Sequence, residues 1–385
     1  MDRSAVDAQI AAVWRLESAR IVAALARMLR DLGEAEELAQ DALVSALERW
    51  PRDGLPERPA AWLIASDELL RLVFAACHPL LGAAARVAQT HKVVCGLGTA
   101  EIARAFLQTE ATVAQRIVRA KRVLAEARVP FEVPQGAERA PRLASVLEVV
   151  YLVFNEGYSA SQGEAWTRGE LLAEALRLAR QLVAIAPGEP EVLGLAALLE
   201  LQASRLPARH DAQGRPVLLE QQDRGRWDRL LVRRGLALRE AAAQAAQRLR
   251  RREGAYALQA AIAAEHARAS SAAHTDWRAI VGLYAQLEAA WPSPVVQLNR
   301  AVAMSRVPGA DLAEALALVQ AIAADPRMAG YPWLPSVQGD LLQRLGRRAE
   351  ARVAFAEAAR RAGNAADRGL MEQRAAALAE GGPGG

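Results

Sequence analysis

The residues best suited to recognising a partner lie between 96 and 128, in the stretch GLGTAEIARAFLQTEATVAQRIVRAKRVLAEAR. The second half of this stretch combines hydroxyl, amide and guanidinium groups, which can bind base edges and phosphates of a nucleic acid. The polar candidates are Thr109, Glu110, Thr112, Gln115, Arg116, Arg119, Lys121 and Arg122. Of these, Thr112, Gln115 and Arg116 suit contacts with base edges. Arg119, Lys121 and Arg122 suit contacts with phosphates. The alternative is an ordinary helical hairpin with a solvated charged face.

Two short helices would position these side chains. Thr99 can cap the first helix, and a turn over 107–109 would follow it. Glu110 then starts a second helix, which would bury Val113, Ile117 and Leu124 and turn its polar residues outward. This is the arrangement of a helix-turn-helix, whose second helix enters the major groove of DNA.

A second group of candidates is acidic and lies in RDLGEAEELAQDALVSALERW, at 30–50. The pattern predicts an acidic helix, and charges at a solvated face would show the same pattern. The candidates are Asp31, Glu36, Glu37, Gln40 and Asp41.

Two other clusters contain residue types that could carry chemistry, but we expect both to have structural roles. Cys77–His78 and His91-x3-Cys95 hold metal-ligating residue types, yet no CxxC or HxxxH pair supports a metal site, so we expect no metal. Asn155, Glu156 and Tyr158 have no histidine nearby to act as a base. We expect a helix-ending turn with Gly157 at the cap, and an inter-domain contact through these three residues.

The composition predicts an all-α protein. Apolar residues make up 52% of the chain but aromatic residues only 5%, and the strong helix formers Ala, Leu, Arg and Glu dominate. The net charge of +4 means that any binding of nucleic acid must be local. Two cysteines exclude a disulfide scaffold. With no long uncharged apolar run and no secretory segment, we expect a cytoplasmic protein without membrane spans or cofactors.

The second half of the chain contains a repeat. Positions Ile280, Ala315 and Ala351 begin similar patterns at steps of 35 and 36 residues, and Pro292 and Pro326 lie 34 residues apart. An earlier stretch over 175–187 has the same phase. A period near 34 is typical of tetratricopeptide (TPR) arrays, in which each helical hairpin packs on the next.

The two candidate stretches together resemble the extracytoplasmic-function (ECF) sigma factors of the sigma-70 family. Glu101–Ala103, Thr112–Val113, Arg116 and Arg119–Ala120 match the pattern of sigma region four, which implies recognition of the minus-thirty-five element. The stretch 31–41 is similar to region two, which implies binding to the clamp helices of the largest subunit of core RNA polymerase. Segments such as VVYLVFNEGYSAS and LLEQQDRGRWD resemble the ECF subgroup with a large TPR-like C-terminal extension, which implies control of activity by that extension.

One segment departs from the family pattern. After Trp62–Leu63 the family continues into a basic helix that melts and reads the minus-ten element, whereas here Ser66 is followed directly by Asp67. The intact matches on both sides favour an omission of these residues from the sequence. The alternative is a true deletion, in which case polymerase docking and minus-thirty-five recognition would survive without promoter opening.

We therefore expect three domains: a region-two-like domain at 1–66, a region-four-like helix-turn-helix domain at 67–130 and a TPR-like extension at 131–385. The expected function is that of an alternative sigma factor with core RNA polymerase and promoter DNA as partners, and with a protein or ligand partner for the extension. The alternative is a TPR-containing DNA-binding regulator or adaptor that never joins the polymerase. We do not expect an enzyme, because no catalytic constellation converges in the sequence.

Overall fold

A computed structural model of the chain describes residues 72–93, 98–105, 108–129, 134, 138–159, 165–211, 217–362 and 365–379, and seven single positions before residue 41. Its contacts divide the chain into two compact units, Met1–Ala186 and Pro187–Gly385. The described residues form helices joined by turns and contain no β-strand, so the prediction of an all-α fold is confirmed for this part of the chain.

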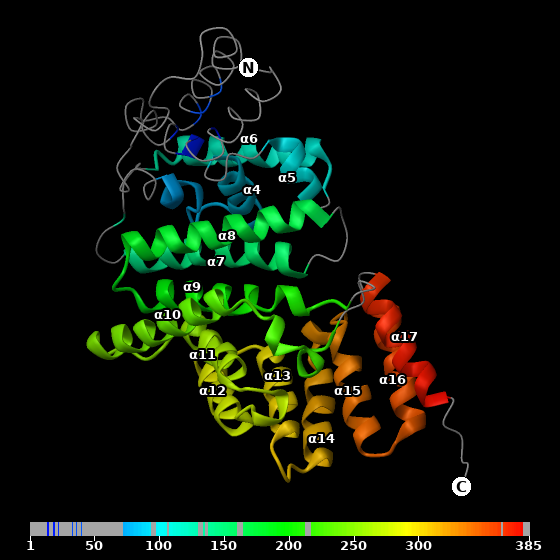
Figure 1. Cartoon of the computed structure of the whole chain (residues 1–385). Helices are drawn as coiled ribbons and strands as arrows, with labels where there is room; N and C mark the ends of the chain where they lie inside the picture. The colour runs from blue at the N-terminus through cyan, green and yellow to red at the C-terminus, as the bar shows by residue number, and fades with distance from the viewer. Residues whose placement is uncertain are drawn as a thin grey trace, which may run out of the picture. The chain divides into compact units, whose positions relative to one another are not determined.

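From residue 72 onward, the described part of the first unit has a short helical stretch at 72–76 and five longer helices (Figure 1). These helices are α4 (Ala83–Val93), α5 (Thr99–Ala105), α6 (Glu110–Glu126), α7 (Arg139–Ser159) and α8 (Ala165–Ile185). Helices α4, α5 and α6 pack on one another, α7 pairs with α8, and α4 also contacts α7. The first unit therefore contains both the candidate DNA-binding helices and residues 139–185, which we had assigned to the extension.

The residues of the second unit that the structure describes include nine α-helices, most of which pack against the helix that follows (Figure 1). They are α9 (Pro190–Ala203), α10 (Arg229–Arg248), α11 (Ala255–Arg268), α12 (Trp277–Ala290), α13 (Pro294–Arg306), α14 (Leu312–Ala323), α15 (Trp333–Arg344), α16 (Arg348–Arg361) and α17 (Ala365–Ala379). Short 3-10 turns lie between some of them, including η3 (Leu219–Gln221) and η4 (Arg224–Arg226).

Side-chain caps explain where several of these helices begin. The carboxylates of Asp228, Asp276 and Asp311 and the hydroxyl of Ser293 accept hydrogen bonds from the first free amides of α10, α12, α14 and α13. Each cap satisfies amides that have no partner inside the helix. Pro294 follows its cap as the first residue of α13, where its missing N–H costs nothing.

The positions that define the sequence repeat lie in alternate helices and are buried. Ile280, Ala315 and Ala351 belong to α12, α14 and α16, with at most 2% of each residue exposed. Val319 and Phe355, one turn further along α14 and α16, are also fully buried. The repeat of 35 to 36 residues therefore marks positions that alternate helices bury.

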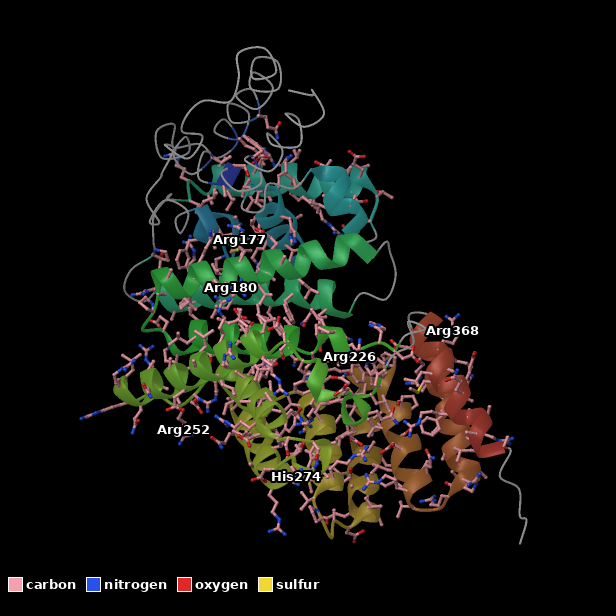
Figure 2. The ribbon with its side chains drawn as sticks, in the orientation of Figure 1. Arg177, Arg180, Arg226, Arg252, His274 and Arg368 are labelled. Atoms are coloured by element: carbon pink, nitrogen blue, oxygen red, sulfur yellow. The ribbon has the colours of Figure 1, made fainter. Side chains whose placement is uncertain are left out.

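One arginine anchors the described residues that follow 217 in the segment between α9 and α10. Arg224 donates to the carbonyl of Ala269 (2.6 Å) and the hydroxyl of Thr275 (3.1 Å). Its guanidinium also lies over the ring of Trp227. The position of this segment can be followed in Figure 2 from the label of the neighbouring Arg226. The neighbouring turn η3 contacts the short turn at 272–274. Both contacts hold this segment against the chain between α11 and α12.

Candidate nucleic-acid interface

A small apolar core holds α4, α5 and α6 together. Ala88 of α4, Ile102 and Ala103 of α5, and Val113 and Ile117 of α6 form one buried cluster. A second cluster joins Leu81 to the other end of α6 through Ala120 and Leu124. Buried residues therefore recur every three or four positions along one side of α6, which fixes its rotation about its own axis.

The start of α6 is set by Thr109. Its hydroxyl oxygen accepts a hydrogen bond from the amide of Thr112 (3.2 Å), and its backbone is extended, as an N-cap requires. Glu110 is the first helical residue and lies at the positive end of the helix dipole. The predicted start at Glu110 and the predicted burial of Val113, Ile117 and Leu124 are confirmed.

Three of the candidate DNA-binding residues share the exposed side of α6. Gln115, Arg119 and Arg122 are exposed and follow one another at spacings of four and three, opposite the buried stripe. Arg119 has no partner among the described residues. Arg122 makes only a surface ion pair with Glu126 (3.5 Å), which contributes little to stability. These side chains are free to contact a ligand.

The other candidates lie at the edges of this face and are engaged by neighbours. Thr112 is half-buried beside Thr109, and the guanidinium of Arg116 donates to the side-chain oxygen of Gln108 in the turn. The ammonium of Lys121 lies 2.9 Å from a carboxylate oxygen of Glu36. In this conformation Arg116 and Lys121 therefore have intramolecular partners where a base or a phosphate would bind.

The acidic candidates are only partly described. Asp31, Glu37 and Asp41 lie outside the described residues. Glu36 is helical and 4% exposed, and its carboxylate also lies 3.8 Å from Lys92 of α4. Gln40, by contrast, is exposed. A polymerase contact through Glu36 would therefore require its pairs with the two lysines to open.

Polar side chains link α4 to α7. Arg86 donates to the hydroxyl of Ser145 and pairs with Glu148 (2.8 Å), while Ser145 donates to the carbonyl of Cys77. Arg142 donates to the carbonyl of Phe74 (3.0 Å). This set, which we call the α4–α7 clamp, satisfies buried polar groups on both sides and ties the candidate DNA-binding helices to residues after 138.

The cysteine and histidine residues that could suggest a metal site have other partners. The thiol of Cys77 lies 3.1 Å from the hydroxyl of Thr90, and burial raises the pKa of this thiol to about 12. His91 pairs through Nδ1 with the carbonyl of Val87 (2.7 Å), and burial lowers its pKa. Over the described ranges, no three His, Cys, Asp or Glu side chains come together as metal ligands. Cys95 lies outside them.

The predicted turn at Gly157 is wrong. Helix α7 continues to Ser159, and Gly157 is buried within its last turn. Tyr158 stacks on Phe154, with ring centroids 5.3 Å apart, and Asn155 is half-buried. The side chain of Glu156 lies outside the description. The expected inter-domain contact through Asn155, Glu156 and Tyr158 stays a prediction.

Several residues of this interface were missed from the sequence. Val118 is 67% exposed on the same side of α6 as Gln115 and Arg122, and the helical period alone could have placed it there. Gln108 contacts Arg116, and Lys92 contacts Glu36, but no local sequence pattern indicates either contact. Gln108 acts within the turn, whereas Lys92 acts across 56 residues of sequence (92 − 36).

Comparisons with known proteins identify relatives but not an activity. A family of unknown function (DUF6596) matches residues 142–243, which span most of α7, all of α8 and α9, and most of α10. An uncharacterized protein of Rhizobium meliloti (strain 1021) is 43% identical over 388 aligned positions, covering 89% of this chain and 90% of the relative.

At that identity and coverage, the chain belongs to the same family as the Rhizobium meliloti protein. No solved structure matches the chain significantly. Among the described residues, none of the helices combines the length and apolarity needed to cross a bilayer.

Proposed function

We propose that this protein is an alternative sigma factor of the ECF type, which binds core RNA polymerase and directs initiation at specific promoters. In this proposal α6 enters the major groove of the minus-thirty-five element, and the acidic segment at 31–41 binds the polymerase. The TPR-like C-terminal extension regulates activity and has no catalytic role of its own. The site of action is the cytoplasm, where the polymerase and promoter are found.

One observation carries the DNA-binding part of this proposal. Helices α5 and α6 pack through a shared core and leave the stripe of Gln115, Arg119 and Arg122 facing solvent. An amide can bond to a base edge, and guanidinium groups can reach bases or phosphates. The exposed methyl groups of Val118 suit contact with the methyl group of thymine.

The test is run-off transcription with purified core polymerase and the full chain, on promoters selected by binding. We expect Gln115→Ala to relax preference at one base position by a discrimination of about 1–3 kcal/mol. Arg119→Ala should weaken binding to all sequences and lower the salt slope of log K by about 0.9. Arg352→Ala is the matched control, because Arg352 is also an exposed helical arginine without a partner among the described residues.

A second candidate function is a DNA-binding regulator that never joins the polymerase. It is favoured by the burial of Glu36 against Lys92 and Lys121, which leaves this acidic residue unavailable to a polymerase surface. Co-purification of the full chain with core enzyme separates the two proposals. Failure to bind core enzyme under conditions where a known initiation factor binds would reject the sigma factor.

A further inference from the structure

The second unit contains a cavity that the proposed function does not use. Its volume is about 320 Å³, and η3, α11, α12, α13, α15 and α17 all contribute to its lining. Apolar side chains form much of the wall, including Leu218, Trp277, Tyr284, Val302 and Val337. A volume of this size lies at the lower end of the range for small-molecule sites.

An arginine-rich network lies along one side of the cavity. Arg306 pairs with Glu220 (3.0 Å) and with Asp340 (3.2 Å). Asp340 also accepts a hydrogen bond from Arg374 (2.8 Å) and lies 3.9 Å from Arg344. Three arginines therefore share two carboxylates, and a positive charge remains in excess.

Two further arginines act on His266, another residue of the cavity lining. The His266 ring lines the cavity and packs edge-on against Trp277, with centroids 5.3 Å apart. Burial first, and then the nearby guanidinium groups of Arg205 and Arg224, lower the pKa of His266 to about 4. His266 is thus neutral at pH 7, and the field around it is positive. Burial and repulsion from Arg306 likewise lower the pKa of Arg344.

The lining also offers polar groups that no neighbour uses. Asn299 and Ser336 face the cavity, and neither has a hydrogen-bond partner in the part of the chain that the structure describes. An amide and a hydroxyl can orient a ligand once the surplus charge has attracted it. A few polar groups in a mainly apolar wall are typical of small-molecule sites.

We propose that this cavity binds a small organic monoanion, a carboxylate carried on an apolar body. The apolar body would pack against Trp277, Tyr284 and Val302. The carboxylate would compensate the excess charge of the arginine network and accept hydrogen bonds from Asn299 or Ser336. The site goes beyond the proposed function, and its occupancy is measured without polymerase or DNA.

The test is isothermal titration calorimetry on the full chain at pH 7 with four probes. Phenylacetate and hexanoate carry the proposed chemistry, whereas 2-phenylethanol and phenethylamine replace the carboxylate with a neutral or cationic group. We expect the two carboxylates to bind with Kd on the order of 0.1 mM. The alcohol should bind at least about tenfold weaker, because it lacks the negative charge that the arginines attract. The amine should not bind, because the same arginines repel its positive charge.

Ser336 provides a matched pair of variants. Ser336→Asp adds a carboxylate one helical turn before Asp340, which should cancel the excess charge and weaken phenylacetate binding at least about tenfold. Ser336→Asn introduces a neutral side chain of similar size to aspartate that can still donate a hydrogen bond, so it should weaken phenylacetate binding much less than Ser336→Asp does. If Ser336→Asp does not fold, as judged by its melting curve, Val302→Asp on α13 replaces it. The proposal is overturned if neither acid binds, if acid and alcohol bind equally, or if the added aspartate has no effect.

Discussion

The ammonium of Lys121, on the helix proposed to read DNA, lies 2.9 Å from the buried carboxylate of Glu36. The two residues are 85 positions apart in the sequence (121 − 36), and Lys92 approaches the same carboxylate. One acidic residue therefore neutralises a cation of the candidate interface and is itself withdrawn from any partner. This pair gives the proposed function a direct test.

Glu36→Gln should increase the affinity of the full chain for DNA. Without the carboxylate, Lys121 is free to pair with a phosphate, so the salt slope of log K should steepen by about 0.9. Fluorescence anisotropy with a DNA duplex over a range of salt concentrations measures this slope. The double variant Glu36→Gln/Lys121→Gln is the control and should return to the original slope. An unchanged slope in the single variant would show that Lys121 does not reach DNA.

A close approach of two helices predicts a large effect at Gly194. A Cβ placed on Gly194 of α9 would lie 2.5 Å from the backbone nitrogen of Ala257 in α11, which cannot move without shifting the helix. We expect Gly194→Ala to lower the free energy of unfolding by about 1–3 kcal/mol, as overpacking does. Urea denaturation measures the loss. Gly282→Ala is the control: it also lies within a helix but faces open space, so it should stabilise by about 0.5–1 kcal/mol.

Helices α10 and α15 are each followed by a residue in the left-handed region, an arginine after α10 and a glycine after α15. Arg250 follows α10 with φ +52°, and Gly346 follows α15 with φ +76°. At both ends the next amide bonds back to a carbonyl five residues earlier, the pattern of a Schellman cap. An arginine in this conformation costs about 1–2 kcal/mol, which glycine avoids at some cost in chain entropy.

Arg250→Gly should therefore raise the free energy of unfolding by about 0.5–1 kcal/mol, and Gly346→Ala should lower it by about 1 kcal/mol. Arg250 lies two residues from Arg252, which Figure 2 labels on the loop before α11. Arg250→Ala removes the same charge without relieving the backbone and should leave stability nearly unchanged. If alanine stabilises as much as glycine, charge repulsion and not backbone strain is responsible.

His266 predicts a loss of stability in acid. Its pKa is about 4 in the folded protein, below the value of about 6.5 in an unfolded chain, so the unfolded state binds a proton first. Stability is complete above about pH 6.5 and falls as the pH decreases toward 4, by up to about 1.4 kcal/mol per pH unit. Chemical denaturation at pH 7, 6 and 5 measures the slope.

His266→Phe keeps an aromatic edge against Trp277 and should reduce that slope. The buried His91 of the first unit also has a lowered pKa and contributes a slope of the same sign. The comparison is therefore between the variant and the parent at each pH. A slope identical in the two proteins would mean that the pKa of His266 is the same in the folded and unfolded states.

Local features of this fold could be predicted from the sequence, and long-range ones could not. The start of α6 at Glu110 follows from a capping threonine, and the buried stripe follows from the 3.6-residue period. The same reasoning failed at Gly157, because the helix buries that glycine in its last turn and continues past it.

The intramolecular partners of the candidate DNA-binding residues could not be predicted, because they depend on tertiary contacts. Gln108 holds Arg116 across a turn, and Glu36 holds Lys121 across 85 residues. Periodicity places Arg116 and Lys121 on the flanks of α6 but carries no information about what packs there. The cavity beside Asp340 likewise forms where helices far apart in sequence meet.

The α4–α7 clamp decides how this protein can be divided for study. A fragment ending near residue 130 would leave Arg86 without Ser145 and Glu148, and the carbonyls of Phe74 and Cys77 without their donors. It would also uncover the side of α4 that α7 contacts. The shortest self-sufficient piece that retains α4, α5 and α6 should extend through α8 to Ala186, so part of the region matched by the DUF6596 family lies in the same unit as the candidate DNA-binding helices.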